Sequence, residues 1–182
     1  MPEIFEGRPK DEGGRLEKEI KTYDLLDRLN VAYLRTDHAP AMNMDVCDDI
    51  NKCLNAVMCK NLFLCNRQET EFYLLMMPGN KKFKTKYLSA QLGVARLSFA
   101  KEEYMERFLG LAPGSVTVMG LMNDTQGRVR LVIDREVLSL EYVGCHPCIN
   151  TSSIRLRTKD LLDTVLPAIC HEPVIVDLPD EP

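Results

Sequence analysis

The chain has 182 residues, 45% of them hydrophobic and 27% charged, which fits one globular domain with a substantial core. No apolar run approaches the roughly 18 residues that span a bilayer, and the polar start, MPEIFEGRPKDEGGRLEKE, lacks the apolar centre of a signal peptide, so we expect a cytoplasmic protein with no membrane partner. The formal net charge of −4 argues against an extended basic surface for long nucleic acid but leaves room for a small basic patch.

The first 36 residues predict an arm, a helix and a strand. Residues 1–13 are polar, contain Gly and Pro, and are typical of a loose arm. Apolar side chains recur at three- and four-residue spacings between Leu16 and Leu29, which predicts an amphipathic helix. A short strand is expected at Ala32–Thr36.

The rest of the chain alternates apolar, strand-like runs with helical segments. Asn43 or Asp45 is placed to cap a second helix that ends near Leu54. Gly93 and Gly110 each follow the last apolar position of a helical segment and are expected to close it. In chain order, the further predicted elements are strands at 57–65 and 72–77, a helix at 87–92, a strand at 96–99, a helix at 101–109, strands at 115–119, 129–133, 139–143 and 153–157, a helix at 159–169 and a strand at 174–178.

The order of these elements predicts the fold class. Several strands are joined by turns that are too short for parallel crossovers. We therefore expect an α/β fold of the α+β type, a single domain in which helices pack on a mixed, mainly antiparallel sheet. No repeat or change of composition marks an internal boundary, so the expected organisation is an N-terminal arm at 1–13, one domain at 14–178 and a tail at 179–182.

The stretch GCHPCINT, residues 144–151, holds two cysteines at the spacing of a redox or metal motif, with a histidine between them. A redox CxxC pair gains a low thiol pKa at a helix N-terminus, but the β-branched residues that follow here indicate a turn and a strand. A structural zinc site needs a second ligand pair, and the other two histidines are isolated in the sequence. Redox activity and zinc binding by Cys145, His146 and Cys148 are therefore minor alternatives.

The other cysteines do not form such a motif. Seven cysteines are an odd number for a disulfide framework, and we expect reduced thiols. Four of them recur every six residues, a period that fits neither a helix face nor a zinc site, and are expected to be small buried hydrophobes. These are Cys47, Cys53, Cys59 and Cys65.

Two polar positions stand out in apolar or turn surroundings. Gly144 and Pro147 bracket His146 in a turn, where a side chain can point into a cleft and backbone amides can face a ligand. Lys60 lies inside the apolar run VMCKNLFLC, where a lysine is costly unless its ammonium meets an anion, a carbonyl or a cleft, or reaches the rim. Asn61 points to the opposite face of a regular strand, although a bulge could bring both side chains to one cleft.

A basic loop, GNKKFKTK, follows the strand at 72–77. It is either a solvated surface or a contact for phosphates, and it could supply only a few phosphate contacts, which suits the end of a nucleic acid better than a long duplex. Its lysines are Lys81, Lys82, Lys84 and Lys86, and four arginines could add to them: Arg128, Arg130, Arg155 and Arg157. The chain has no GxxxxGK[ST], GxGxxG, GxSxG or HExxH motif, so nothing indicates nucleotide hydrolysis, nicotinamide chemistry or metalloprotease action.

Six segments, taken in order, resemble the YbaK/ProX family of aminoacyl-tRNA editing domains: CKNLFL, FYLLMM, LGVARLSFA, LGLAPGSVTVMGLMND, VRLVIDREVL and GCHPCINTSSIRLRTKDLL. The resemblance covers roughly residues 16–178. Its most specific parts are the lysine in the apolar strand, the PGSVT turn followed by MND, and the GxHP loop that runs on into NTSS. The chain looks most like the free-standing alanyl-tRNA(Pro) deacylases of this family.

The resemblance implies hydrolysis of the ester that joins a mischarged amino acid to the terminal ribose of tRNA. The residues it implies as catalytic are Lys60, Asn61 and His146, and those it implies as substrate-binding are Gly144, Cys145 and Pro147. No metal or organic cofactor is implied. The implied partners are the acceptor end of tRNA(Pro) and, as a second candidate, prolyl-tRNA synthetase.

The substrate remains open at this stage. Alanine is favoured by the look of the N-terminal helix and of the C-terminal HEPVIVDLPD. Alternatives are a deacylase for cysteine or serine, a non-catalytic module that binds tRNA or a synthetase, and a thiol redox or zinc protein built on CHPC. Cysteines on both sides of His146 and the polar arm depart from the expected pattern.

Overall fold

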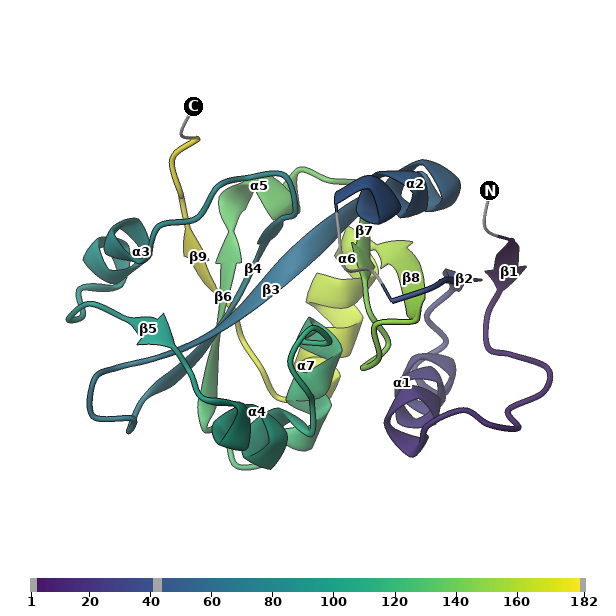
Figure 1. Cartoon of the computed structure of the whole chain (residues 1–182), viewed down its shortest axis with the longest axis horizontal. Coiled ribbons are helices and arrows are strands. Elements are labelled where there is room, and N and C mark those ends of the chain that lie inside the picture. Colours follow the sequence, from purple (N-terminus) through teal and green to yellow (C-terminus); the bar gives the residue numbers. More distant parts are fainter. Residues whose placement is uncertain (1–2, 41–43, 181–182) are drawn as a thin grey trace.

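The structure is a computed structural model that describes residues 3–40 and 44–180 (Figure 1). The predicted cap Asn43 and the side chain of Asp45 lie outside the described part. The helices are α1 (Glu17–Arg28), α2 (Met44–Leu54), α3 (Thr85–Leu92), α4 (Glu102–Leu109), the 3-10 helix η1 (Val118–Asn123), α5 (Arg135–Leu138), and a last helical stretch of α6 (Thr158–Asp160), the π-helical η2 (Leu161–Val165) and α7 (Leu166–Ala168).

Nine strands form one mixed sheet. They are β1 (Ile4–Glu6), β2 (Tyr33–Asp37), β3 (Val57–Cys65), β4 (Phe72–Pro78), β5 (Ser98–Phe99), β6 (Val129–Asp134), β7 (Tyr142–Cys145), β8 (Ser152–Arg157) and β9 (Val174–Val176). The order is β1-β2-β8-β7-β3-β4-β6-β9, with β5 paired to β3. The β3–β7, β4–β6 and β6–β9 pairs are parallel and the other five are antiparallel, which confirms the expected mixed, mainly antiparallel α+β fold.

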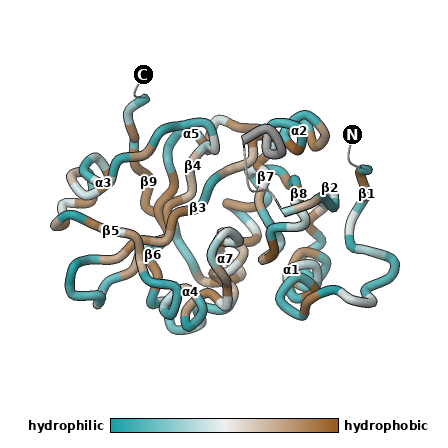
Figure 2. Tube along the Cα trace, in the orientation of Figure 1, coloured by the Kyte–Doolittle hydropathy of each residue, from teal (hydrophilic) through white to brown (hydrophobic). Residues whose placement is uncertain are grey.

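Helices cover both faces of the centre of the sheet. Alternate residues of the β3–β4 hairpin enter two different clusters, as the two-residue period of a strand requires. Phe63 and Phe72 pack in the larger cluster with α4 and α7, whereas Leu64 and Tyr73 pack on the other face with Leu88 of α3. Figure 2 shows the resulting concentration of hydrophobic residues on the central strands.

The described part of the N-terminal arm, from residue 3 onward, is ordered, so the expectation of a loose arm is wrong for these residues. Strand β1 pairs antiparallel with β2. The Arg8 guanidinium lies 2.9 Å from a carboxylate oxygen of Asp24 and 3.2 Å from one of Asp27, and it also contacts Glu12. These contacts fasten the arm to helix α1, a long-range effect that polar composition does not reveal.

Two predicted strands differ from the structure. The apolar run predicted as a strand at 115–119 leads into the 3-10 helix η1, where the Thr117 hydroxyl oxygen accepts a hydrogen bond from the Met119 amide at 3.3 Å. The alternation of Ser115 and Thr117 with valines is typical of a strand, but both polar residues are buried together with Val118, Met119 and Leu121, so the alternation does not mark a solvent-facing side. The strand predicted at 139–143 begins only at Tyr142, after the one-turn helix α5, which Asp134 caps.

Within the described residues no helix is both long and apolar enough to cross a membrane. The remaining predicted elements are present with shifts of a few residues at their ends. The hairpin strand 57–65 has the predicted bounds, and Gly93 and Gly110 close their helices in the left-handed conformation, each with φ of 65°.

Candidate active site

A pocket of about 530 Å³ brings together the three residues that were predicted to be catalytic, Lys60, Asn61 and His146. It lies between helix α2, the first half of strand β3 and two loops. Its walls also include Ile50 and Met58, both of which are apolar. Residues more than 80 positions apart in the sequence therefore meet in one cavity that combines an apolar wall with several polar groups, which is typical of a small-molecule site.

The edge of β3 explains how Lys60 and Asn61 both reach this pocket. The register of β3 with β4 runs from Cys59 to Cys65 without interruption, so no bulge turns the strand here. On the opposite edge, β7 pairs with β3 only at Val57 and Met58, and β5 pairs only at Leu64 and Cys65. The middle of that edge has no strand partner among the described residues, and the pocket surrounds the open edge, so neighbouring residues can line it.

Lys60 is half-buried, and its ammonium donates a hydrogen bond to the carbonyl oxygen of Lys81. Burial of the side chain lowers the pKa of Lys60 below its ordinary value. The ammonium is thus held at a rim of the pocket by a neutral acceptor, so its charge is available to an anionic or polarised group of a ligand.

Asn61 presents an uncompensated acceptor. Its side-chain amide nitrogen lies 3.4 Å from the carbonyl oxygen of Cys59, but its Oδ1 atom is buried and has no hydrogen-bond partner within the described chain. A buried acceptor without a partner costs free energy, and native proteins rarely retain one. We expect a donor from a ligand or a water to complete it.

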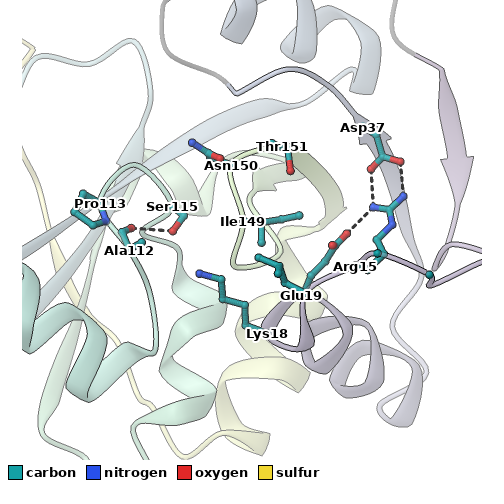
Figure 3. A pocket seen from close by; sticks show the side chains of 13 residues that line it. Arg15, Lys18, Glu19, Asp37, Ala112, Pro113, Ser115, Ile149, Asn150 and Thr151 are labelled. Atoms are coloured by element: carbon teal, nitrogen blue, oxygen red, sulfur yellow. Dashed lines mark hydrogen bonds and ion pairs between the residues drawn. The ribbon is translucent and has the colours of Figure 1, made fainter.

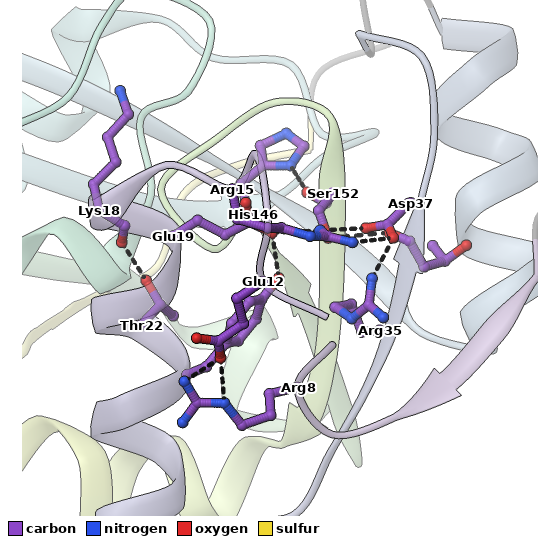
Figure 4. Close-up of polar contacts among 12 residues, drawn as sticks. Arg8, Glu12, Arg15, Lys18, Glu19, Thr22, Arg35, Asp37, His146 and Ser152 are labelled. Carbon is purple, nitrogen blue, oxygen red and sulfur yellow. Dashed lines mark hydrogen bonds and ion pairs between the residues drawn. The ribbon is translucent and has the colours of Figure 1, made fainter. Parts of the chain in front are cut away.

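His146 is fixed in one orientation by the loop that follows it. Its Nδ1 lies 2.9 Å from the carbonyl oxygen of Ser152 (Figure 4). The same atom lies 3.4 Å from the Ser153 hydroxyl, which in turn lies 2.8 Å from Nε2 of His38. A carbonyl can only accept, so Nδ1 carries the proton and the neutral ring keeps Nε2 as an acceptor. Burial lowers the pKa of His146, the Ser152 carbonyl opposes this shift, and His38 adds to it.

We expect ring-nitrogen NMR to show His146 neutral at pH 7, protonated on Nδ1, and titrating below its ordinary value of 6.5. The folded pKa is depressed, so the unfolded chain binds more protons in the window below 6.5. The contribution of His146 to stability is therefore full above that window and is lost as the pH falls through the folded pKa. A ring that titrates above 6.5, or that carries its neutral-form proton on Nε2, would contradict this assignment.

Gly144 acts through packing rather than by lining the pocket. It pairs with Met58 across the parallel β3–β7 pair. A Cβ at position 144 would lie 2.2 Å from the Met58 sulfur and 3.2 Å from its Cα. Only glycine lets the two backbones approach this closely, and this approach sets the position of Met58 in the pocket wall.

Cys145 and Pro147, predicted as substrate-binding, do not line the pocket either. Both are buried, and Cys145 is only 1% exposed. Direct contact of Gly144, Cys145 and Pro147 with a substrate stays a prediction.

The two thiols of the CHPC stretch have a low reactivity because they are buried and protonated. Burial raises the pKa of Cys145, and it raises the pKa of Cys148 to about 11. Both thiols are therefore protonated at neutral pH, which opposes nucleophilic and metal-ligand roles. No group of three His, Cys, Asp or Glu side chains in residues 3–40 and 44–180 is arranged to hold a metal ion.

Of the four cysteines at six-residue spacing, two are buried hydrophobes as predicted, namely Cys59 and Cys65. Cys53 is half-buried, and the side chain of Cys47 lies outside the described part of the chain.

The basic loop is only partly available to a nucleic acid. Lys81 is 7% exposed, and its ammonium lies 3.0 Å from Asp134 and 3.1 Å from Glu136, so its charge is already paired and its role as a tRNA contact stays a prediction. Lys82, Lys84 and Lys86 are exposed, and Lys86 lies 4.5 Å from the centre of the Tyr87 ring. The tRNA-binding prediction for these three lysines is untested by the fold.

Several residues of the pocket were not among the predicted site residues. The Asn51 side-chain oxygen accepts a hydrogen bond from the Met58 amide at 2.8 Å and joins α2 to β3. A Cβ at Gly79 would lie 2.5 Å from the Met58 carbonyl oxygen, so this glycine allows the hairpin to close over the strand. Gly114 and Val116 line the far side of the pocket. Of these residues, only Gly79 could have been noticed in the sequence, because a glycine directly after a strand indicates a turn or a close backbone approach.

A second cavity, of about 490 Å³, lies on the other side of the turn at 112–116 (Figure 3). Three of its four charged side chains pair with one another: the Arg15 guanidinium lies 2.6 Å from Glu19 and 2.7 Å from Asp37. Burial would raise the pKa of Asp37, but hydrogen bonds from Arg15 and Arg35 hold it well below its usual range. These mutually compensated charges stabilise the arm and β2 and leave the other pocket as the better candidate for chemistry.

Comparison with known proteins identifies the family. The sequence profile of the aminoacyl-tRNA editing domain matches residues 38–164, more than half of the chain. The chain belongs to the aminoacyl-tRNA editing domain family. This confirms the YbaK/ProX-like resemblance, and the matched range of the editing domain includes Lys60, Asn61 and His146.

Relatives of this editing domain agree with the match. The prolyl-tRNA editing protein ProX of Acetoanaerobium sticklandii is 29% identical over 136 residues, which cover 75% of this chain and 83% of that protein. Prolyl-tRNA synthetase associated domain-containing protein 1 of Danio rerio is 29% identical over 163 residues, 88% of this chain and 86% of that protein. The crystal structure of a candidate trans-editing enzyme for prolyl tRNA synthetase superposes with a TM-score of 0.64 at 13% identity, over 90% of this chain and 99% of that one, and shows the shared fold.

Proposed function

We propose that this editing domain is a trans-acting deacylase that hydrolyses the aminoacyl ester of mischarged tRNA(Pro), with alanine as the amino acid removed. The observation that carries the proposal is the meeting of Lys60, Asn61 and His146 in one pocket of an aminoacyl-tRNA editing domain. The names of the ProX and synthetase-associated relatives support proline tRNA as the carrier. Prolyl-tRNA synthetase is the second partner that we propose, and the cytoplasmic location stays a prediction.

The reaction requires little covalent chemistry from the protein. Water adds to the ester carbonyl, the bond from the carbonyl carbon to the ribose oxygen breaks, and that oxygen takes up a proton, giving the free amino acid and tRNA. Because the ester is already activated, the enzyme needs to position the reactants and stabilise the developing negative charge. The resemblance to the family implies that the ribose 2′-hydroxyl helps to activate the water.

Lys60 supplies the positive charge for this task. Its ammonium is partly desolvated, which strengthens its attraction to an oxyanion or to the terminal phosphate. Its contact with the Lys81 carbonyl keeps it extended toward the pocket rim before substrate binds. This arrangement requires little reorganisation during the reaction.

Asn61 and His146 would orient the substrate. The unpartnered Oδ1 of Asn61 can accept a hydrogen bond from the substrate α-ammonium or from a ribose hydroxyl. The neutral His146 ring, held by Ser152, offers Nε2 as an acceptor. We assign His146 to positioning of the ribose, because the substrate's own hydroxyl can activate water.

Specificity would come from exclusion. One methylene is worth only about 1–3 kcal/mol of discrimination in an apolar pocket, so alanine cannot be distinguished sharply from smaller residues. Proline is bulkier and cyclic, and the apolar wall of Ile50, Met58 and Val116 can reject it by steric clash.

The test is release of labelled amino acid from Ala-tRNA(Pro), Cys-tRNA(Pro), Ser-tRNA(Pro) and Pro-tRNA(Pro), with and without a chelator. We expect chelator-resistant release of alanine with proline spared. Preferential release of cysteine or serine would keep the reaction and change the substrate. Tight tRNA binding without any release would favour the alternative, a non-catalytic binding module.

A further inference from the structure

A third hollow, a surface groove of about 940 Å³, lies between strand β5 and the start of helix α3. These elements are at the end of β3 that is far from the active-site pocket (Figure 1). Four cationic side chains line the groove: Arg67, Lys84, Lys86 and Arg96. No carboxylate lines it among the residues that the structure describes. In a chain whose net charge is −4, this is a local concentration of positive charge.

Two aromatic rings complete the groove. Phe99 is 63% exposed, the largest exposure of any large hydrophobic side chain in the described residues. Phe83 lies beside it, with ring centroids 6.4 Å apart in an edge-to-face arrangement. An exposed aromatic ring among cations is the composition of surfaces on which nucleic acid bases stack while phosphates contact Lys and Arg.

One acidic side chain of the hairpin turn, Glu69, is already neutralised. Glu69, two residues after Arg67, lies 2.7 Å from the Lys101 ammonium and accepts a hydrogen bond from the Tyr104 hydroxyl at 2.9 Å. It therefore reduces the positive potential of the groove only weakly.

Strand β3 connects the groove to the active-site pocket. Phe99 pairs with Leu64, four residues beyond Lys60 on the same strand. At about 3.3 Å per residue the separation along the strand is roughly 13 Å. Leu62 and Phe83 pack in the same cluster, so the sheet face that carries Lys60 leads directly to the groove.

This separation matches a short run of nucleotides. At about 3.4 Å per stacked nucleotide, roughly 13 Å corresponds to about four nucleotides. The open edge of β3 between its β7 and β5 pairs runs along the same path.

We infer that the groove binds the acceptor end of the tRNA about four nucleotides from the ester, with a base stacked on Phe99 and phosphates contacting Arg67, Lys86 and Arg96. This inference rests on the proposed function, because the ester in the Lys60 pocket sets the register. The groove contributes binding of the polynucleotide and takes no part in the chemistry.

The test uses Phe99→Ala and the double variant Arg67→Gln with Arg96→Gln, with two substrates: labelled Ala-tRNA(Pro) and alanyl-adenosine, which is too short to reach the groove. We expect Phe99→Ala to lower kcat/KM for the tRNA about tenfold through a higher KM. The double variant should reduce the slope of log affinity against log salt by about 2. Both variants should hydrolyse alanyl-adenosine as the wild type does.

A matched control removes two exposed cations away from the groove, Arg28→Gln with Lys159→Gln, and should leave the tRNA reaction unchanged. Equal losses on tRNA and on alanyl-adenosine, or no loss on tRNA, would overturn the inference. If the wild type hydrolyses neither substrate, the proposed function fails. The affinity of the wild type and the groove variants for uncharged tRNA(Pro) then tests separately whether the groove binds tRNA. Weaker binding by the groove variants would support it, and equal binding, or none by the wild type, would reject it.

Discussion

Replacing Lys60 with alanine is expected to lower kcat for Ala-tRNA(Pro) by about 10²- to 10³-fold, the usual cost of removing one group that stabilises an oxyanion. Lys60 is the one lysine or arginine that lines the pocket in the described chain, and it lies next to the orphaned acceptor of Asn61. No neighbouring cation can take its place. The measurement is single-turnover release of labelled alanine.

The matched control is Lys159→Ala, which removes an exposed lysine away from the pocket and should leave turnover unchanged. Thermal unfolding should show that both variants fold. Because the Lys60 ammonium makes its hydrogen bond to a neutral carbonyl, its loss leaves no buried charge behind. Wild-type turnover in Lys60→Ala would remove this residue from the mechanism.

Lys81→Ala is expected to lower the free energy of unfolding by about 3–5 kcal/mol, the cost of leaving a buried charge without its partner. Asp134 is 0% exposed, and its Oδ2 atom makes no hydrogen bond within the described residues, so its ion pair with Lys81 at 3.0 Å is its compensation. Urea unfolding at neutral pH measures the effect. Lys82→Ala should change the free energy of unfolding by no more than about 0.5 kcal/mol.

A second variant separates charge from packing. Lys81→Met with Asp134→Asn removes both charges while Asn keeps the cap that Asp134 Oδ1 provides to the Glu136 amide at 3.1 Å, so it should be more stable than Lys81→Ala. Stability of Lys81→Ala equal to that of the wild type, together with weaker tRNA binding, would favour Lys81 as a tRNA contact.

The ion pair of Lys81 with Asp134 also makes the stability of the protein depend on pH. Burial lowers the pKa of Lys81, but its pairing with the carboxylates of Asp134 and Glu136 outweighs this effect and raises the pKa above its ordinary value. The stabilisation is therefore full below the ordinary lysine pKa and is lost as the pH rises through the folded pKa.

Much of the fold follows from local sequence patterns. The spacing of apolar residues in 16–29 and the uninterrupted apolar runs of the hairpin determine their elements with little help from distant contacts. The errors occur where distant contacts decide. Thr117 starts a 3-10 helix inside a fully buried run, and β1 is ordered by pairing with β2.

The site was predictable only in part, for a physical reason. Lys60 stands out because a lysine in an apolar strand needs a special environment, and a turn exposes His146 to a cleft. Lys81 shows the limit of this reasoning, since its partner Asp134 lies 53 residues away and only the fold brings them together. The groove is hidden in the same way, because the β3–β5 pair assembles Arg67, Phe83 and Phe99 from three segments.

The most direct test that the Lys60 pocket binds the aminoacyl ester is a crystal structure with 3′-alanylamino-3′-deoxyadenosine, in which an amide replaces the labile ester. We expect the alanyl carbonyl to lie within hydrogen-bond reach of the Lys60 ammonium. Asn61 Oδ1 should accept a hydrogen bond from the ligand, and the ribose should lie beside His146. An analogue bound instead in the cavity of Figure 3, beside Arg15 and Asp37, would contradict this expectation.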